Sequence, residues 1–545
     1  MKKRIVLYNP SMAEGRGGFP VSKDQLPLPL MTIAAWPDRE GYEIVLLDAN
    51  LGEPEAMHRR VLEACDGALL YATTGILGHQ VADGLECSTK VKQRFPALPM
   101  FIGGWWASVV PEMQLATGLY DAVCIGQGET TFRDLVHAVD SGASLEGVAG
   151  LMLEREGEYV RTAPRRLVGW DQLLDTPWHL IDIAPYRDAQ LNARAEREAA
   201  RMITPPGFNG RPVWGITYYS SFGCPEPCSF CCSPQVSGQR WLAMPAERML
   251  DDLCGLHERW GFDCVRFYDA NFGVQEQRVK AFCDGLIARG SPFQWHAMLQ
   301  TFSLLRWKPE TLSVLRPAGL YHSVVGAETA DDAMRELVGK HSRSNDNVRA
   351  AELLDAIGVG SLFSYIIGYP GESEASMLRT LDECRHIAAT CKLARPMAWP
   401  YSPIPGTELY ARAIEHGFRA PKTLAEWSGA GEYHLWYSEN WPNQIPKSVQ
   451  LARQTFEHFA SLALGLVRGR VGWWERRAQQ RLRAGNFRFA RAEARAFALY
   501  HRISNAVGLE RRPREIFAGI QTARMPRPTA ASEAHAAPLR PSERA

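Results

Sequence analysis

The chain has 545 residues with 46% apolar, 22% charged and 10% aromatic content, which excludes a wholly disordered protein and allows about three folded domains. The formal net charge is +1, so no field of the whole protein favours a nucleic-acid partner. Its twelve cysteines do not form the framework of a small secreted scaffold, and the sequence contains neither a signal-peptide core nor a run of about 18 apolar residues, so we expect a cytoplasmic protein.

Short apolar runs alternate with helix-length polar segments over residues 1–140. They predict a parallel sheet with helices on both faces, a flavodoxin-like or Rossmann-like α/β domain. The expected strands are Ile5–Tyr8, Glu43–Asp48, Ala68–Ala72, Met100–Gly104 and Ala122–Gly126. Several runs end in small or polar residues, which places glycine-rich loops at the carboxyl edge, where open α/β sheets bind ligands. For any single glycine, a role in a tight turn is equally open.

A less regular segment, residues 141–212, is expected to connect this domain to a second alternating series. We interpret residues 213–407 as a partial TIM-like (β/α)6 barrel, with its ligand face at the carboxyl ends of the strands. The expected strands are Val213–Ser220, Cys264–Ala270, Phe293–Leu299, His322–Glu328, Leu362–Gly368 and Met397–Pro403.

The carboxyl-terminal part is expected to be helical and Trp-rich over residues 408–520 and disordered over 521–545. From Arg468 onward it has 17 Arg and 6 Glu with no Lys or Asp, a net charge of +11 against −10 in the rest of the chain. Two interpretations stay open. One is a solvated helical face, and the other is contact with an anionic membrane surface or an acidic partner, because Trp473, Trp474, Phe487 and Phe489 lie among the arginines.

Three cysteines stand close together as Cys224, Cys228 and Cys231 in SFGCPEPCSFCCSP, directly after the first strand of the second series. A structural zinc site would usually have four ligands in two separated pairs, and the sequence has no second pair. Three thiolates on an iron–sulfur cubane leave one iron open to a small molecule. Cys232 is interpreted as a bystander, because the spacing is complete without it. The other eight cysteines are expected to be small buried hydrophobes: Cys65, Cys87, Cys124, Cys254, Cys264, Cys283, Cys384 and Cys391.

This CxxxCxxC motif, with Phe230 before its last cysteine, resembles the radical S-adenosylmethionine (SAM) superfamily. A leading α/β domain joined to such a barrel is similar to the cobalamin-binding class of these enzymes. Further stretches that resemble this class are Leu26–Trp36, Gly103–Glu112, Asp121–Phe132, Val324–Ala330, Ile366–Ser373 and Tyr401–Tyr410.

The resemblance implies a 4Fe-4S cluster on the three cysteines, whose open iron chelates SAM. One electron then cleaves SAM to methionine and a 5′-deoxyadenosyl radical. It also implies SAM contacts, with Asp269 at the methionine amino group, Glu328 beside the nucleoside and Gly368 near the adenine. Phe230 and Gly326 are assigned to the same cofactor. For Asp269 and Glu328, a loop-capping carboxylate is equally open.

The resemblance also implies cobalamin in the first domain, although one known signature, DxHxxG, is missing. His79 has Leu77 and Ala82 where that signature requires Asp and Gly, so it is not expected to bind cobalt. Candidate contacts for the corrin and its nucleotide tail are Thr74, Gly103, Gly104, Ser108, Gly126, Gly128 and Glu129. Trp105 and Trp106 either shield the lower cobalt face or simply pack in the core.

The leading hypothesis is methyl transfer to an unactivated carbon of a small-molecule substrate, with reduced flavodoxin or ferredoxin as electron donor and no nucleic-acid partner. One alternative is an oxidative cyclase or rearrangement enzyme similar to the anaerobic porphyrin-ring cyclases. Another is a non-catalytic iron–sulfur and cobalamin sensor. Transfer-RNA methylthiolation is disfavoured, because the leading domain has no extra cluster cysteines and no small basic barrel is expected at the end.

Overall fold

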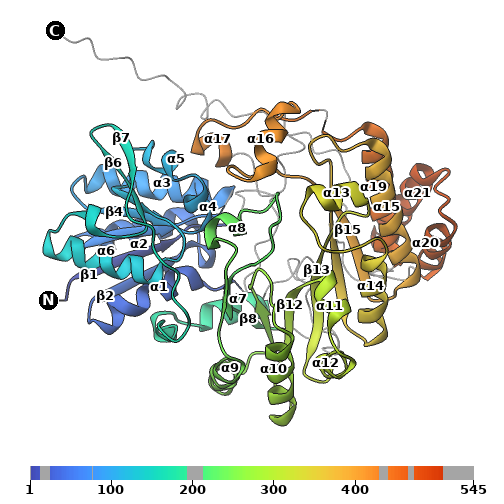
Figure 1. The fold of residues 1–545 in the computed structure, drawn as a ribbon, viewed down its shortest axis with the longest axis horizontal. Coiled ribbons are helices and arrows are strands. Elements are labelled where there is room, and N and C mark those ends of the chain that lie inside the picture. The colour runs from blue at the N-terminus through green and yellow to red at the C-terminus, as the bar shows by residue number, and fades with distance from the viewer. Residues whose placement is uncertain are drawn as a thin grey trace, which may run out of the picture.

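The computed structural model describes residues 2–12, 25–76, 78–192, 213–428, 440–442, 444–463 and 472–506. The expected tail 521–545, residues 193–212 of the expected connector and Trp436 lie outside these residues. Two sheets, one mainly and one wholly parallel, dominate the described part, one at each side of the molecule as drawn in Figure 1, and helices of the carboxyl-terminal region lie over both.

The first sheet has seven strands in the order β2-β1-β3-β4-β5-β6-β7. The five predicted strands are all present and parallel. Their bounds are β1 Arg4–Asn9, β2 Glu43–Asp48, β3 Leu70–Thr74, β4 Met100–Gly103 and β5 Ala122–Cys124. The associated helices are α1 Leu28–Arg39, α2 Pro54–Cys65, α3 His79–Arg94, α4 Trp105–Val109, α5 Pro111–Leu115 and α6 Glu129–Ser141.

Both faces of this sheet are covered, as the alternation along β1 demonstrates. Ile5 and Leu7 pack in a core with α1 and α6, whereas Val6 and Tyr8 pack on the opposite face with α2 and α3. All four side chains are fully buried. A strand buried on both faces has a continuous apolar sequence, which is why the runs could be recognised.

Two strands of the first sheet lie in the segment expected to be a connector. β6 (Leu151–Arg155) and β7 (Glu158–Arg161) extend the sheet antiparallel, joined by a tight turn in which Glu156 and Gly157 both have positive φ. All four residues of β7 are exposed, so this strand has no apolar run. The rest of the described connector holds α7 (Ala184–Asn192).

The second sheet has six parallel strands in the order β15-β14-β13-β12-β11-β8, and all six were predicted. Within the described residues β8 and β15 do not pair with each other, so this sheet is open. The strands are β8 Gly215–Tyr218, β11 Cys264–Phe267, β12 Gln294–Gln300, β13 Leu320–Glu328, β14 Gly360–Ile367 and β15 Ala394–Pro400. The helices are α8 Ser233–Ser237, α9 Ala246–Trp260, α10 Glu276–Ala288, α11 Thr301–Arg306, α12 Pro309–Leu315, α13 Asp332–Leu337, α14 Asp346–Ala356 and α15 Glu374–Thr390.

The carboxyl-terminal helices pack on elements of both sheets. They are α16 Glu408–Glu415, α17 Leu424–Ser428, α19 Lys447–Ala463, α20 Gly472–Ala484 and α21 Ala490–Ala506. α17 packs on α3 of the first sheet, while α19 and α20 pack on α15 beside the second. Trp427 and Trp441 are buried in the apolar cluster that joins these parts, so the sequence's tryptophans there form a core. No helix within the described ranges is long and apolar enough to cross a membrane.

Candidate functional site

The cysteine motif lies in a loop closed by a short antiparallel pair, β9 (Ser221–Gly223) and β10 (Trp241–Ala243). Gly223 begins the loop with φ near +80°, and a Cβ there would come within 2.2 Å of the Arg240 carbonyl oxygen. Only glycine allows the two ends to approach so closely. Cys224 and Cys228 are buried, and Cys231 is half-buried.

This loop is anchored to distant parts of the chain through Ser229. Its amide donates to the Val338 carbonyl at 3.3 Å, and its hydroxyl donates to the Leu337 carbonyl at 2.9 Å. Its carbonyl accepts from the Leu409 amide at 3.2 Å, at the start of α16. The loop is therefore held between the residues after α13 and the carboxyl-terminal region.

The three thiols fit a cluster better than a single ion. All three are free, and burial raises the pKa of the Cys228 thiol to about 12. Ligands of one zinc ion at about 2.3 Å lie within about 4.6 Å of each other. Among the described residues, three ligand-type side chains have ligand atoms that all lie within 4.8 Å of one another: Glu55, His58 and Glu86. The sulfurs of the three motif cysteines do not meet this distance. Wider separation suits sulfurs bound to different irons.

Of the other cysteines, Cys232 supplies the start of α8, since its carbonyl accepts from the Gln235 and Val236 amides at 3.0 and 3.1 Å. Five of the remaining eight are buried as expected, and three are half-buried. The half-buried ones are Cys124, Cys254 and Cys264.

Asp269 is fully buried and holds the chain that enters the cysteine loop. Its carboxylate accepts from the Ser220 amide at 3.2 Å, from the Ser220 hydroxyl at 2.9 Å and from the Ser221 hydroxyl. Burial raises the pKa of Asp269, while these bonds and the neighbouring Arg278 oppose that shift. The contact with SAM stays a prediction, and the observed bonds give Asp269 a positioning role.

Glu328 ends β13 with φ near +63°, a conformation that a side-chain-bearing residue seldom adopts. Its carboxylate pairs with the buried Lys340 ammonium at 3.1 Å, and Lys340 also donates to Gln300 at 2.6 Å. Burial lowers the pKa of Lys340 and the Glu328 carboxylate raises it, with a net upward shift, so the ammonium stays charged. A Cβ on Gly326 would lie 2.6 Å from the Glu328 carboxylate, so glycine at this position leaves room for the pair.

Gly368 lies under the carboxyl-terminal region rather than in open space. It has φ near +78°, and a Cβ would come within 2.9 Å of Ile445 and 3.3 Å of Gln444. The Gln444 amide donates to the Gly368 carbonyl at 3.1 Å and to the Tyr401 carbonyl at 2.6 Å. Glu372 accepts from the Gly368 amide at 2.7 Å. The adenine contact expected of Gly368 is untested, and close packing explains the glycine by itself.

Replacing Gly368 by alanine should lower stability more than the same change at Gly358. Both glycines have φ between +75° and +78°, but a Cβ at Gly358 meets no atom within 4 Å. We expect about 1 kcal/mol from backbone strain at Gly358 and about 2–3 kcal/mol at Gly368, where the clash with Ile445 adds to it. Chemical denaturation measures the free energy of unfolding of both variants. Equal losses of stability would contradict the close packing of Ile445 on the turn at Gly368.

The carboxyl edge of the first sheet is built from loops with little side-chain bulk. Gly104 has φ near +94°, and a Cβ would lie 2.5 Å from the Thr74 hydroxyl. The Ser108 hydroxyl donates to the Gly104 carbonyl at 2.8 Å and accepts from the Gly126 amide at 3.0 Å, which ties two loops together. Thr74 lines a cavity of about 10 Å³, room for about one water, so a large ring would have to lie above this edge.

The remaining candidates at this edge have mixed surroundings. A Cβ on Gly103 would lie 3.3 Å from the Cys124 side chain, and a Cβ on Gly128 would lie 3.0 Å from the Ile33 side chain. Burial raises the pKa of Glu129, at the start of α6. Trp106 is fully buried against Trp427, with ring centroids 5.2 Å apart, so it packs in the core, and the side chain of His79 lies outside the described residues.

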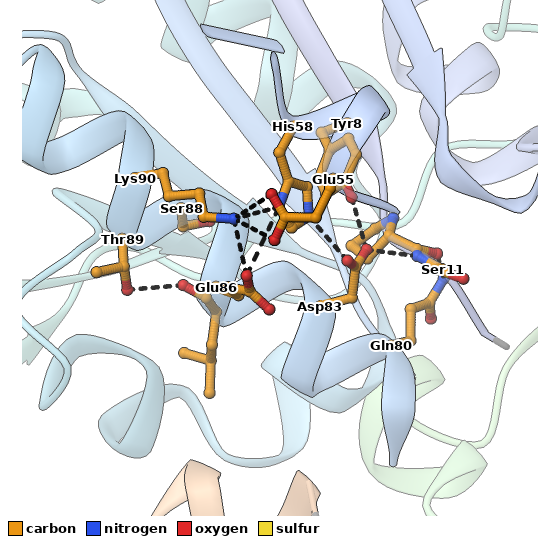
Figure 2. A network of polar contacts seen from close by, with 12 residues as sticks. Tyr8, Ser11, Glu55, His58, Gln80, Asp83, Glu86, Ser88, Thr89 and Lys90 are labelled. Carbon is orange, nitrogen blue, oxygen red and sulfur yellow. Dashed lines mark hydrogen bonds and ion pairs between the residues drawn. The ribbon is translucent and has the colours of Figure 1, made fainter. Parts of the chain in front are cut away.

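A polar network fixes the loop that follows β1 (Figure 2). Asp83 accepts from the Tyr8 hydroxyl at 2.6 Å and from the Ser11 amide at 2.7 Å, and it contacts His58 at 2.8 Å. The Lys90 ammonium lies among Glu55, Glu86 and His58, within 3.0 Å of an atom of each. The ammonium thus provides the cation for this group of ligand-type atoms, and the network stabilises the sheet edge.

The two ligand edges come together at α8. A Cβ on Gly126 would lie 3.5 Å from the Val236 carbonyl, and α4 packs against α8. α8 directly follows the cysteine motif, and Gly126 and α4 belong to the carboxyl edge of the first sheet. The carboxyl edge of the first sheet therefore lies next to the helix that follows the cysteine motif.

The family model of the radical SAM superfamily matches residues 218–384, which include the motif and strands β11–β14. This region belongs to the radical SAM superfamily. An uncharacterized methyltransferase of Pyrococcus horikoshii is 26% identical over 57% of this chain and 62% of its own length. The anaerobic magnesium-protoporphyrin IX monomethyl ester cyclase of Synechocystis is 22% identical over 70% of this chain and 72% of its own length.

The fold of this radical SAM protein matches that of a cobalamin-dependent member. The methyltransferase TsrM of Kitasatospora setae, solved with cobalamin and a 4Fe-4S cluster, superimposes with a TM-score of 0.62 at 16% identity. The match covers 89% of this chain and all of the other. It extends well beyond the radical SAM core and confirms the resemblance read from the motif.

Some residues of the radical SAM site were not predicted. Lys340 and Gln300 lie far from the motif in sequence and meet each other only in the fold, whereas Ser229 lies inside the motif and only its partner Leu337 is distant. Lys340 lies twelve positions after the end of the expected strand His322–Glu328, and neither its spacing nor its sequence neighbours indicate that it is buried. For Gln444 likewise, no local pattern indicated a bond to the turn at Gly368.

Proposed function

We propose that this chain is a cobalamin-dependent radical SAM methyltransferase that methylates an unactivated carbon of a small molecule. The observation that carries the proposal is the contact between the carboxyl edge of the first sheet, at Gly126 and α4, and α8 next to the cysteines. Methyl transfer of this kind needs two cofactors within reach of one substrate, and this junction adjoins both candidate sites.

The residues of the candidate site would bind the cofactors, orient them and exclude water. Cys224, Cys228 and Cys231 would hold the 4Fe-4S cluster, and Glu328, oriented by Lys340, would lie beside SAM. The loops at Thr74, Gly103–Gly104, Ser108 and Gly126–Glu129 would support the corrin. When bound, the cluster with SAM supplies the radical and cobalamin supplies the methyl group.

The carboxyl-terminal segment would close the site. Gln444 bonds the turns at Gly368 and Tyr401, at the carboxyl ends of β14 and β15, and Phe230 lies 6.2 Å from Tyr369, centroid to centroid. This apolar cover would keep water from the radical. A reduced flavodoxin or ferredoxin would supply the electron, and an oxygen-sensitive cluster would require a reducing compartment such as the cytoplasm.

Product analysis separates methyl transfer from the runner-up, an oxidative cyclase, which the match to the magnesium-protoporphyrin cyclase over 70% of the chain favours. We expect anaerobic turnover with methyl-labelled SAM and a small-molecule extract of the source cells to yield 5′-deoxyadenosine and S-adenosylhomocysteine together, with label in a product. The 5′-deoxyadenosine without S-adenosylhomocysteine would reject methyl transfer and favour the cyclase. Neither product from the iron-loaded chain would reject both.

A further inference from the structure

Helices α20 and α21 and the turn between them form a basic hairpin at the outer side of the molecule. The side chains of this hairpin are described for residues 472–500. Its exposed residues include five arginines and no carboxylate. These are Arg476, Arg483, Arg488, Arg491 and Arg495. Among the described residues none of the five has an ion-pair partner, whereas the inner Arg477 and Arg481 both pair with Glu493.

Large apolar side chains project from the same hairpin. Trp473, Leu499 and Phe489 are 58%, 59% and 71% exposed, more than any other large apolar residue in the described part. Phe489 also has φ near +64°, a conformation that bulky residues rarely adopt, although the ring gains little packing there. Arg488 lies 5.2 Å from the centre of this ring.

The hairpin is remote from the cysteine loop. α20 packs on α15 and α19, beside the second sheet, and Figure 1 places it at the opposite margin of the molecule from the first sheet. The cysteine loop instead adjoins α4 and α16. Neither docking of an electron donor at the cluster nor substrate entry explains these exposed charges and rings.

We propose that the basic hairpin binds the surface of an anionic lipid bilayer. Unpaired arginines complement the negative headgroups, and aromatic and aliphatic side chains enter the boundary between headgroups and acyl chains. The exposure of Trp473, Leu499 and Phe489 among the arginines favours a bilayer, whose boundary region takes up apolar side chains, over a partner that is acidic alone. The inference is independent of the proposed reaction, because no residue of the hairpin belongs to the candidate site.

Vesicle sedimentation with the full chain tests the proposal. We expect binding to vesicles of phosphatidylglycerol mixed with phosphatidylcholine, little binding to phosphatidylcholine alone, and release by high salt. Substituting glutamine for Arg483, Arg491 and Arg495 should weaken binding by about a hundredfold, since each charge near such a surface contributes about fivefold. The matched control replaces three exposed arginines elsewhere, Arg59, Arg94 and Arg412, and should bind as the unmodified chain does.

The change Phe489→Asn separates binding from folding. Asparagine accepts a positive φ, so the thermal midpoint should not fall, while vesicle binding should weaken severalfold. No binding to anionic vesicles, or equal losses from the hairpin and control triple variants, would overturn the proposal. A Phe489→Asn chain that binds as tightly as the unmodified one would also overturn the role of the ring.

Discussion

Substituting serine for Cys228 should remove the iron–sulfur cluster and reduce SAM cleavage to the background of the iron-free chain, whereas Cys232→Ser should leave both intact. Cys228 is a buried free thiol inside the loop, and an alcohol, which is far less acidic than a thiol, is a poor replacement for a thiolate as an iron ligand. Cys232 is its near neighbour but lies outside the CxxxCxxC spacing; its carbonyl begins α8, and its side chain contacts that of Cys231. Iron and sulfide content after anaerobic reconstitution, with formation of 5′-deoxyadenosine, measures the difference.

Both substitutions change one sulfur to oxygen, so the pair also controls for folding. We expect similar thermal midpoints for the two variants before reconstitution, since neither adds bulk to the loop. Cluster retention in Cys228→Ser would contradict the ligand assignment. Equal loss in Cys232→Ser would assign a ligand or supporting role to the fourth cysteine of the loop.

The parts of the fold that bury strands on both faces were predictable from the sequence. β1 reads as a continuous apolar run because its alternate residues enter two different cores. β7 was missed because all its residues are exposed, so it has no apolar run. The turn residues Glu156 and Gly157, which lie between two short charged segments, are the hairpin signal in the sequence. β9 and β10 were missed because three-residue strands are defined by their pairing and not by composition.

The candidate site was predictable only where its chemistry is local. Three cysteines within eight residues predict a ligand role by their spacing alone, while the contacts of Lys340 with Glu328 and Gln300 on neighbouring strands arise only in the fold. The structure also adds contacts that the sequence did not indicate to two predicted residues. Asp269 accepts hydrogen bonds from the serines that lead into the cysteine loop, and Gly368, which has no side chain, leaves room for Gln444 and Ile445 of the carboxyl-terminal segment.

Substituting methionine for Lys340 should both destabilise the fold and weaken SAM binding. The ammonium is buried between the Glu328 and Gln300 side chains, so its removal leaves a buried carboxylate without its cation. We expect a loss of about 3–5 kcal/mol in the free energy of unfolding. Loss of a supporting contact of this kind should weaken SAM binding by about 10–100-fold, measured by calorimetry on the reconstituted protein.

The double variant Lys340→Met, Glu328→Gln distinguishes the two effects. Neutralising the carboxylate removes the unpaired buried charge, so most of the stability should return. SAM binding should stay weak, because the carboxylate predicted to lie beside the nucleoside is then missing. Arg453→Met provides the matched control, since Arg453 is a buried cation 3.0 Å from Glu457 in α19, away from the cysteine loop, and its loss should lower stability alone. Recovery of full SAM affinity in the double variant would instead show that the Lys340–Glu328 pair only supports the fold.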